Sequence, residues 1–347
     1  MPDGPAHAEP IAEIFPNLQS DGDSLSLGSA LGPVLRQVCQ QRLGPIDWFR
    51  STWQRSGAAT GFSTWKGPDG VERRVVVKLP VSPKEYTWTL RLGAVDAEAW
   101  DTGDALVRST PRVVAAGEVL GGYDLAWLVV ERLDGHPISS RLSHDNLQGL
   151  IEAIADFQFR AARVRPVTET PDHPDWERLI AKARQLVPEC GIAQSQRWAS
   201  ALKHVSKVLD RLVDAWRARP TATWCHGDAH PGNAMLRPLP DGSERCVLID
   251  LGLVHPGHWI EDALYLERLF WGHEDKLFGV DPLHALAEAR QAAGLPTAGD
   301  VERLAAIRRV LMAACVPVFL AREGSPRYVE AALERLEVGL LRAEKGF

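Results

Sequence analysis

Three side chains suited to phosphate chemistry lie close together in the second half of this 347-residue chain. Asp228 opens a short loop, Asn233 follows five residues later, and Asp250 ends the apolar run 247–249. Transfer of a γ-phosphoryl group needs a carboxylate to orient the acceptor hydroxyl and a divalent cation to neutralise the phosphate oxygens. Asp228 could accept the proton, while Asn233 and Asp250 could offer oxygen ligands to Mg²⁺. The spacing therefore predicts a site for phosphoryl transfer.

The motif His226-Gly227-Asp228-x-x-x-x-Asn233, followed by Ile249-Asp250, resembles the aminoglycoside phosphotransferase and choline kinase group of small-molecule kinases. That group is related to protein kinases, whose corresponding motifs are H-R-D-x-x-x-x-N and D-F-G. The resemblance implies that Asp228 is the catalytic base and that Asn233 and Asp250 bind Mg²⁺. It also implies an α+β, bilobal, protein-kinase-like fold with a small β-rich N-lobe and a larger, mainly helical C-lobe.

The chain departs from protein kinases at Gly227, which replaces the Arg of H-R-D. Few residues separate Asp250 from the next helical pattern, which leaves no room for a long peptide-docking segment. A small hydroxylated acceptor, such as an aminoglycoside, sugar or amino alcohol, is therefore favoured over a protein. Three alternatives stay open: a catalytically silent nucleotide-binding scaffold, a protein kinase, and a transition-metal site that uses His226 and His230.

The nucleotide side of the site is predicted from a strand pattern and a hinge-like segment. Lys78 ends the run V-V-V-K and resembles the lysine that pairs with the ATP phosphates. Such a lysine needs an acid to orient it, and Glu98 is favoured by its spacing over the competitor Glu85. Residues 130–135 resemble the hinge, where backbone groups at Glu131 and Leu133 would contact the adenine. ATP and Mg²⁺ are the expected cofactors, with GTP as an alternative donor.

The acceptor side has two interpretations. The segment from Trp259 to Asp275 contains four aromatic residues and several acids, including Glu267 and Glu274. Acids beside aromatic faces would suit a cationic acceptor through charge pairing and cation–π contact. Alternatively, the aromatic residues belong to the core and the acids to a solvated helix face. Asp262, in a stretch that resembles a helix-anchoring motif of the family, is predicted to be structural.

Composition narrows the class of protein. The chain is 45% hydrophobic and 24% charged, with a net charge of −6, which argues against nucleic acid as a partner. Its longest apolar runs are too short to span a bilayer, and the N-terminal residues show no secretory signal. Five cysteines without a C-x-x-C pair are typical of reduced thiols. These features predict a cytoplasmic protein that does not bind membranes; the oligomeric state is left open.

The pattern of apolar residues predicts the order of the elements. Residues 1–47 are expected to form an N-terminal extension with a short helix, residues 48–134 the nucleotide-binding N-lobe, and residues 135–347 the C-lobe with the catalytic loop. Strands are predicted over 62–66, 72–79, 112–118 and 126–131, because short β-type runs are separated there by Gly-rich turns. From Asp145 onward, apolar residues recur with helical spacing, including over 260–272 and 300–345.

Overall fold

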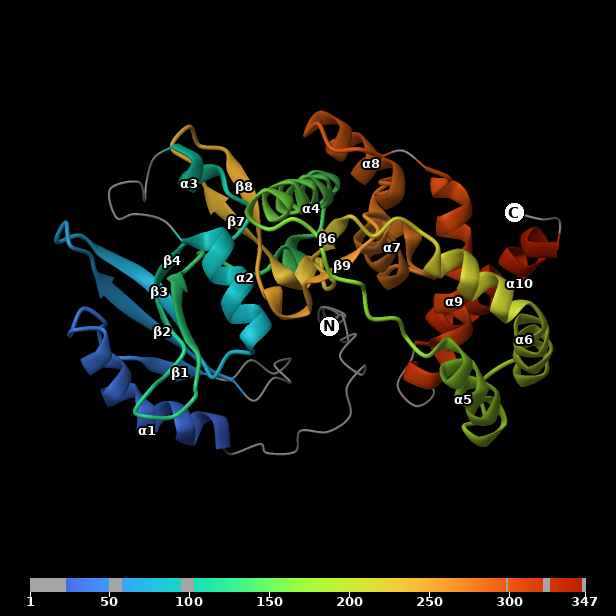
Figure 1. The fold of residues 1–347 in the computed structure, drawn as a ribbon, viewed down its shortest axis with the longest axis horizontal. Helices are drawn as coiled ribbons and strands as arrows, with labels where there is room; N and C mark the ends of the chain where they lie inside the picture. Colours follow the sequence, from blue (N-terminus) through green and yellow to red (C-terminus); the bar gives the residue numbers. More distant parts are fainter. Residues whose placement is uncertain (1–22, 50–57, 95–102, 298, 321–324, 345–347) are drawn as a thin grey trace, which may run out of the picture. The chain divides into compact units, whose positions relative to one another are not determined.

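The computed structural model describes residues 23–49, 58–94, 103–297, 299–320 and 325–344 (Figure 1). Its contacts group the chain into two compact units. Unit 1 gathers residues 1–142, 159–165 and 228–254, and unit 2 gathers residues 143–158, 166–227 and 255–347. The segment 228–254, which contains Asp228, Asn233 and Asp250, therefore belongs to the same unit as the N-terminal sheet.

The sheet of unit 1 has five antiparallel strands in the order β1-β2-β3-β5-β4. The strands are β1 (Asp47–Phe49), β2 (Ala59–Lys66), β3 (Glu72–Leu79), β4 (Val113–Gly117) and β5 (Trp127–Glu131). The predicted hairpin is confirmed as β2 and β3, although β2 begins three residues before the predicted start. Gly70 has φ +76° in the connecting turn, a conformation that favours glycine. Lys78 lies near the end of β3, opposite Thr60.

Alternation along β3 lets a helix cover each face of the sheet. Val75, Val77 and Leu79 pack with Leu35 of α1 (Asp23–Val38) in one buried cluster. Val76 points to the other face and packs with residues of β4, β5 and α2 (Pro83–Gly93). In Figure 1, α1 and α2 lie on opposite sides of the strands. The period of two in a strand thus fixes which side chains meet which helix.

The rest of unit 1 is a short helix, a second hairpin and three single turns. These are α3 (Gly103–Val107), β7 (Ala234–Pro238), β8 (Glu244–Leu248), η2 (Ile138–Arg141), η3 (Pro231–Asn233) and η4 (Leu251–Leu253). Arg237 joins the hairpin to the sheet, because its buried guanidinium pairs with Glu131 of β5. The same guanidinium donates to the carbonyl oxygens of Leu106, Arg108 and Thr110.

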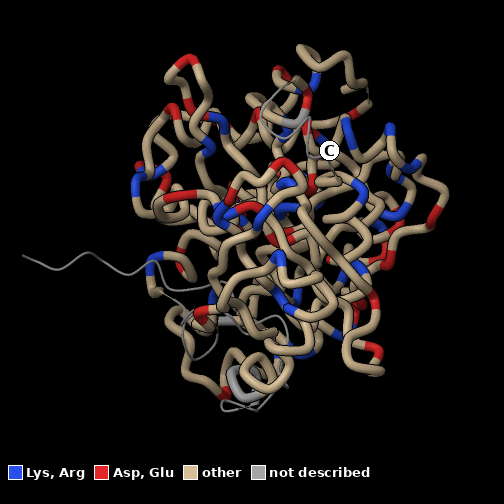
Figure 2. Tube along the Cα trace, turned by 90° about the vertical axis from the view of Figure 1, so that its left-hand side faces the viewer, with Lys and Arg blue, Asp and Glu red and all other residues tan. Residues whose placement is uncertain are grey.

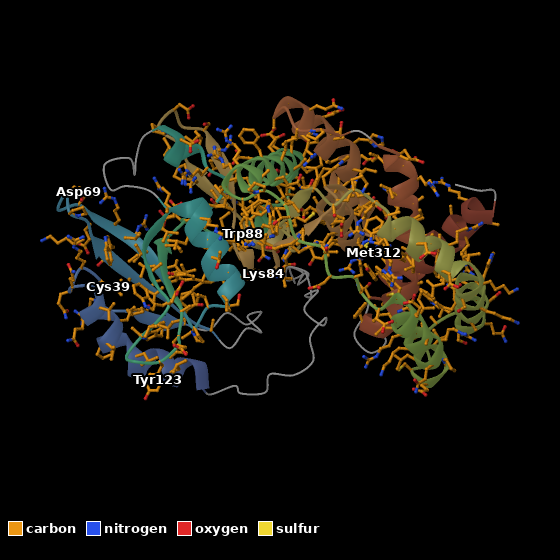
Figure 3. All side chains as sticks on the ribbon, viewed as in Figure 1. Cys39, Asp69, Lys84, Trp88, Tyr123 and Met312 are labelled. Atoms are coloured by element: carbon orange, nitrogen blue, oxygen red, sulfur yellow. The ribbon has the colours of Figure 1, made fainter. Side chains whose placement is uncertain are left out.

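Unit 2 is mainly helical. It contains most of α4 (His144–Val164), α5 (Trp176–Glu189), α6 (Ser195–Arg217), α7 (Ile260–Leu269), η5 (Glu274–Leu277), α8 (Pro282–Ala292), α9 (Val301–Leu320) and α10 (Pro326–Glu344). A two-stranded ladder joins β6 (Thr223–Cys225) to β9 (His255–Gly257). The helical region predicted over 300–345 contains two helices, and Pro326 begins the second. Residues 310–316 of α9, including Met312 (Figure 3), are all buried, so α9 is a core helix.

Acidic and basic positions are interspersed along the described chain (Figure 2). Within the described ranges, each helix is either too short or too polar to cross a bilayer.

Candidate active site

Asp228 and Asn233 are held together by direct hydrogen bonds. The Nδ2 of Asn233 donates to Oδ2 of Asp228 at 2.8 Å and to the Asp228 carbonyl oxygen at 3.1 Å. The Asp228 side chain remains 23% exposed. Because an amide has its donors on one side and its acceptor on the other, this contact directs Oδ1 of Asn233 away from Asp228.

His230 shapes the loop between these two residues. Its Nδ1 accepts a hydrogen bond from the Gly232 backbone N–H at 3.0 Å, so the neutral ring has its proton on Nε2. This Nε2 lies 3.7 Å from Oδ1 of Asp228. A Cβ at Gly232 would approach His230 Nδ1 to 2.9 Å, which explains the need for glycine there. The ring of His226 packs edge-on against Phe157 in the core of unit 2.

The β7–β8 hairpin brings Asn233 close to the segment that ends in Asp250. Ala234 is paired with Leu248, and the backbone N–H of Ile249 donates to the Asn233 carbonyl oxygen at 2.9 Å. Both predicted metal ligands therefore lie at the open end of one hairpin. Asp250 has φ +66°, a left-handed conformation that is uncommon outside glycine and frequent at functional sites.

Lys78 pairs with Glu85 at the same end of unit 1. The Nζ–Oε1 distance is 2.6 Å, and the two side chains are 24% and 14% exposed. Burial opposes the charge on Lys78, but Glu85 and Asp250 together hold the pKa of its ammonium above the ordinary value. A Cβ at Gly252 would lie 3.4 Å from Oδ1 of Asp250 and 4.0 Å from Cβ of Glu85. These contacts place Asp250 beside the lysine and its acid.

The sequence contains a local pattern that favours Glu85 as the partner of Lys78, although spacing alone favoured Glu98. Ser82 is the N-cap of α2 and accepts a hydrogen bond from the Glu85 backbone N–H, while Pro83 occupies the first helical turn. Ser followed by Pro and, three residues on, by Glu is a helix-start pattern. It predicts a helix directly after the strand and so puts Glu85 within reach of Lys78. Glu98 lies outside the described residues.

Glu131 and Leu133 occupy the segment predicted to be the hinge. The Glu131 carboxylate is 5% exposed and binds both Arg112 and Arg237. Leu133 is also mostly buried, and Arg132 between them donates its backbone N–H to the Arg74 carbonyl oxygen at 3.0 Å. The Glu131 side chain thus joins β5 to its neighbours, and any contact with a nucleotide would come from the backbone.

Asp262 anchors the backbone that precedes Asp228. Its carboxylate accepts from the N–H groups of His226 and Gly227 at 3.0 and 2.9 Å, and from Gln158 Nε2 at 2.9 Å. Gly227 has φ +82°. A residue with a side chain would be strained by roughly 1–2 kcal/mol in this region, which is a physical reason for glycine where protein kinases have arginine.

Three glutamates of the predicted acceptor segment are engaged with arginines. Glu267 binds Arg309, Glu274 binds Arg335, and Glu261 binds Arg219. The indole rings of Trp259 and Trp271 are 3% and 0% exposed, so they belong to the core of unit 2. The features that suggested a cationic acceptor therefore have structural partners within the chain.

Comparisons with known proteins identify the family. The model of the phosphotransferase enzyme family matches residues 63–307, well over half of the chain. A comparison with curated proteins found no match.

Two solved structures share the fold. A predicted aminoglycoside phosphotransferase from Ralstonia eutropha JMP134 is 15% identical, with a TM-score of 0.52 over 90% of this chain and 98% of that one. An aminoglycoside phosphotransferase from Alicyclobacillus acidocaldarius is 16% identical, with a TM-score of 0.51 over 89% and 95%. These likenesses confirm the predicted α+β, protein-kinase-like fold. With the family match, they establish that this chain belongs to the phosphotransferase enzyme family.

Proposed function

We propose that this protein transfers the γ-phosphoryl group of ATP to a hydroxyl of a small molecule. One observation supports this most strongly. Within unit 1, Asp228 and Asn233 are hydrogen-bonded, Asp250 follows at the open end of the same hairpin, and the Lys78–Glu85 pair interacts with Asp250. A proton acceptor, two oxygen ligands and a fixed cation are the groups that phosphoryl transfer needs.

Each residue has a role that follows from its surroundings. Asp228 orients the acceptor hydroxyl and takes its proton, while Asn233 fixes the Asp228 carboxylate. Lys78, held protonated by Glu85, binds phosphate oxygens of the nucleotide. Asn233 Oδ1 and the Asp250 carboxylate are hard oxygen donors, which fit Mg²⁺. When bound, that ion neutralises the charge on the phosphate oxygens.

A small acceptor fits the chain better than a protein. Only residues 251–259 separate Asp250 from α7, and they are occupied by η4 and β9. Gly227 in turn lacks the guanidinium with which protein kinases bind a phosphorylated activation loop. An aminoglycoside, a sugar and an amino alcohol all remain candidate acceptors, since the acids near α7 have arginine partners.

The test is a phosphate-transfer screen with the full chain and γ-labelled ATP. Hydroxylated antibiotics, amino alcohols and sugars are offered with Mg²⁺, and Asp228→Asn serves as the matched control. Label should pass to at least one acceptor with the unsubstituted protein and not with the variant. Stabilisation by Mg-ATP without transfer or hydrolysis would favour the silent scaffold instead.

A further inference from the structure

Unit 2 contains a group of buried hydrogen-bond donors without acceptors. The indole Nε1 atoms of Trp176 and Trp216, and the Nε atoms of Arg268 and Arg308, have no hydrogen-bond partner among the described residues. Trp176 is 4% exposed and Trp216 is 0% exposed. Indole and guanidinium nitrogens donate and do not accept. Because buried donors are rarely left unpaired, this group points to an acceptor that the described protein atoms do not supply.

Trp176 and Trp216 both lie against Arg308 on α9. Its Cζ lies 5.2 Å from the ring centroid of Trp176, which starts α5, and 5.0 Å from that of Trp216, near the end of α6. Arg219, just beyond α6, lies over the same Trp216 ring at 4.1 Å. Burial lowers the pKa of the Arg308 guanidinium, Glu261 opposes this, and repulsion from Arg219 and Arg268 lowers the pKa further. The donors and the positive charges therefore occupy one region.

Two arginines in this region share a single carboxylate. Arg219 donates to Oε1 of Glu261 at 2.9 and 3.0 Å, and Arg308 lies 4.0 Å from Oε2 of the same carboxylate. Elsewhere in unit 2, Arg309 and Arg335 each bind a separate glutamate. Arg219 and Arg308 share one carboxylate, with the charge of Arg268 added to theirs. A buried cluster of this sign is stabilised by an anion.

A cation would not fit the same region. Ligand atoms of Cys225, His255 and Glu261 lie within 4.8 Å of one another. However, Glu261 already binds Arg219, and burial raises the pKa of the Cys225 thiol well above its ordinary value. Metal ions bind the thiolate rather than the thiol, and the neighbouring guanidiniums repel a cation.

We propose that Trp176, Trp216 and Arg308 form a binding site in unit 2 for a small anionic molecule that bears a carboxylate or phosphate group. Such a group presents several oxygen acceptors to indole and guanidinium donors. The Arg308 side chain remains 19% exposed, which gives solvent access to the cluster. The site stands apart from the proposed phosphotransfer, because it shares no residue with those proposed to bind ATP or to take the acceptor proton.

The site adjoins the anchor of the catalytic loop. Glu261, which Arg219 and Arg308 share, directly precedes Asp262 in α7. The Asp262 carboxylate holds the backbone of His226 and Gly227. An anion that drew Arg308 away from Glu261 would therefore change the contacts of the residue that directly precedes Asp262.

Indole N–H signals of the ¹⁵N-labelled full chain give a direct test, since the chain has twelve tryptophans. Inorganic phosphate and succinate are titrated separately, with sodium chloride of equal ionic strength as the control. Trp176→Phe and Trp216→Phe assign the two signals of interest. We expect these two signals to shift saturably with phosphate or succinate and to stay in place with chloride.

Two charge variants on α9 complete the test. Arg308→Gln should lower the affinity for the anion by about tenfold or more, the loss expected for a charge-assisted hydrogen bond. Arg303→Gln removes the same charge from an exposed position of the same helix and should leave the affinity unchanged. Melting curves check that each variant folds, and Arg308→Lys, which removes the Nε donor and keeps the charge, replaces Arg308→Gln if the latter does not.

Each outcome is decisive. A response to phosphate alone, or to succinate alone, supports the site and identifies its anion. Equal shifts with chloride, no shift with either anion, or equal losses in the Arg308 and Arg303 variants would overturn the proposal. All measurements are made without nucleotide, so a failed transfer screen would not affect them.

Discussion

Replacing Glu85 by Gln tests which acid orients the phosphate-binding lysine. The substitution keeps the size of the side chain and removes its charge. In the structure, Glu85 Oε1 lies 2.6 Å from Lys78 Nζ, and both side chains are mostly buried. Among the described residues, loss of the carboxylate leaves Asp250 as the remaining acid that attracts Lys78. The lysine then has more freedom and a lower pKa, because burial still opposes its charge.

The size of the effect follows from the contact. A hydrogen bond to a charged group contributes about 1.5–3 kcal/mol, and about 1.4 kcal/mol corresponds to a factor of ten. Complete loss of the hydrogen bond between the Lys78 ammonium and a phosphate oxygen would weaken nucleotide binding roughly 10- to 150-fold. Because Asp250 still attracts Lys78, we expect the lower part of this range, roughly 10- to 30-fold.

Calorimetric titration of Mg-ATP into Glu85→Gln measures this loss, and Glu98→Gln is the matched control. We expect the control to bind nearly as well as the unsubstituted protein. The pH dependence gives a second readout. Lys78 has a raised pKa, so its charge is lost only as the pH rises through that value; in Glu85→Gln the loss of binding should begin at lower pH. A larger loss in Glu98→Gln than in Glu85→Gln would refute the reasoning.

Three further perturbations address the loop, the metal ligands and the hairpin. Asp228→Asn should lower kcat by about 10²–10⁴ with nucleotide affinity nearly unchanged; near-normal turnover would disprove its role as base. Asp250→Ala should weaken Mg-ATP binding in calorimetry far more than Asn233→Ala, because Mg²⁺ prefers a carboxylate to an amide oxygen; equal losses would contradict this ranking. Arg237→Ala should destabilise the protein by about 3–5 kcal/mol in urea unfolding, because it leaves Glu131 buried with one fewer cation; a loss below about 1 kcal/mol would show that Arg112 compensates.

The sequence determined the features that depend on neighbours along the chain. The hairpin over 59–79 follows from alternating apolar residues around a Gly-rich turn. Asn233 follows Asp228 by five positions, and the hairpin that begins directly after Asn233 ends just before Asp250. Local geometry alone can therefore bring the three predicted catalytic and metal-binding residues together, and their types indicate the chemistry.

The tertiary structure decided which charges meet. The packing of α2 against η4 brings Glu85 to Lys78, while Glu98 lies outside the described residues. Glu267 and Glu274, which by sequence could face a cationic acceptor, pair with Arg309 and Arg335.

Pairs such as Arg237 with Glu131 join residues more than one hundred positions apart. Sequence patterns reflect the local period of a helix or strand, whereas ion pairs of this kind depend on how separate elements pack. For this reason candidate reactive residues could be proposed from the chain, while the partners of its buried charges could not.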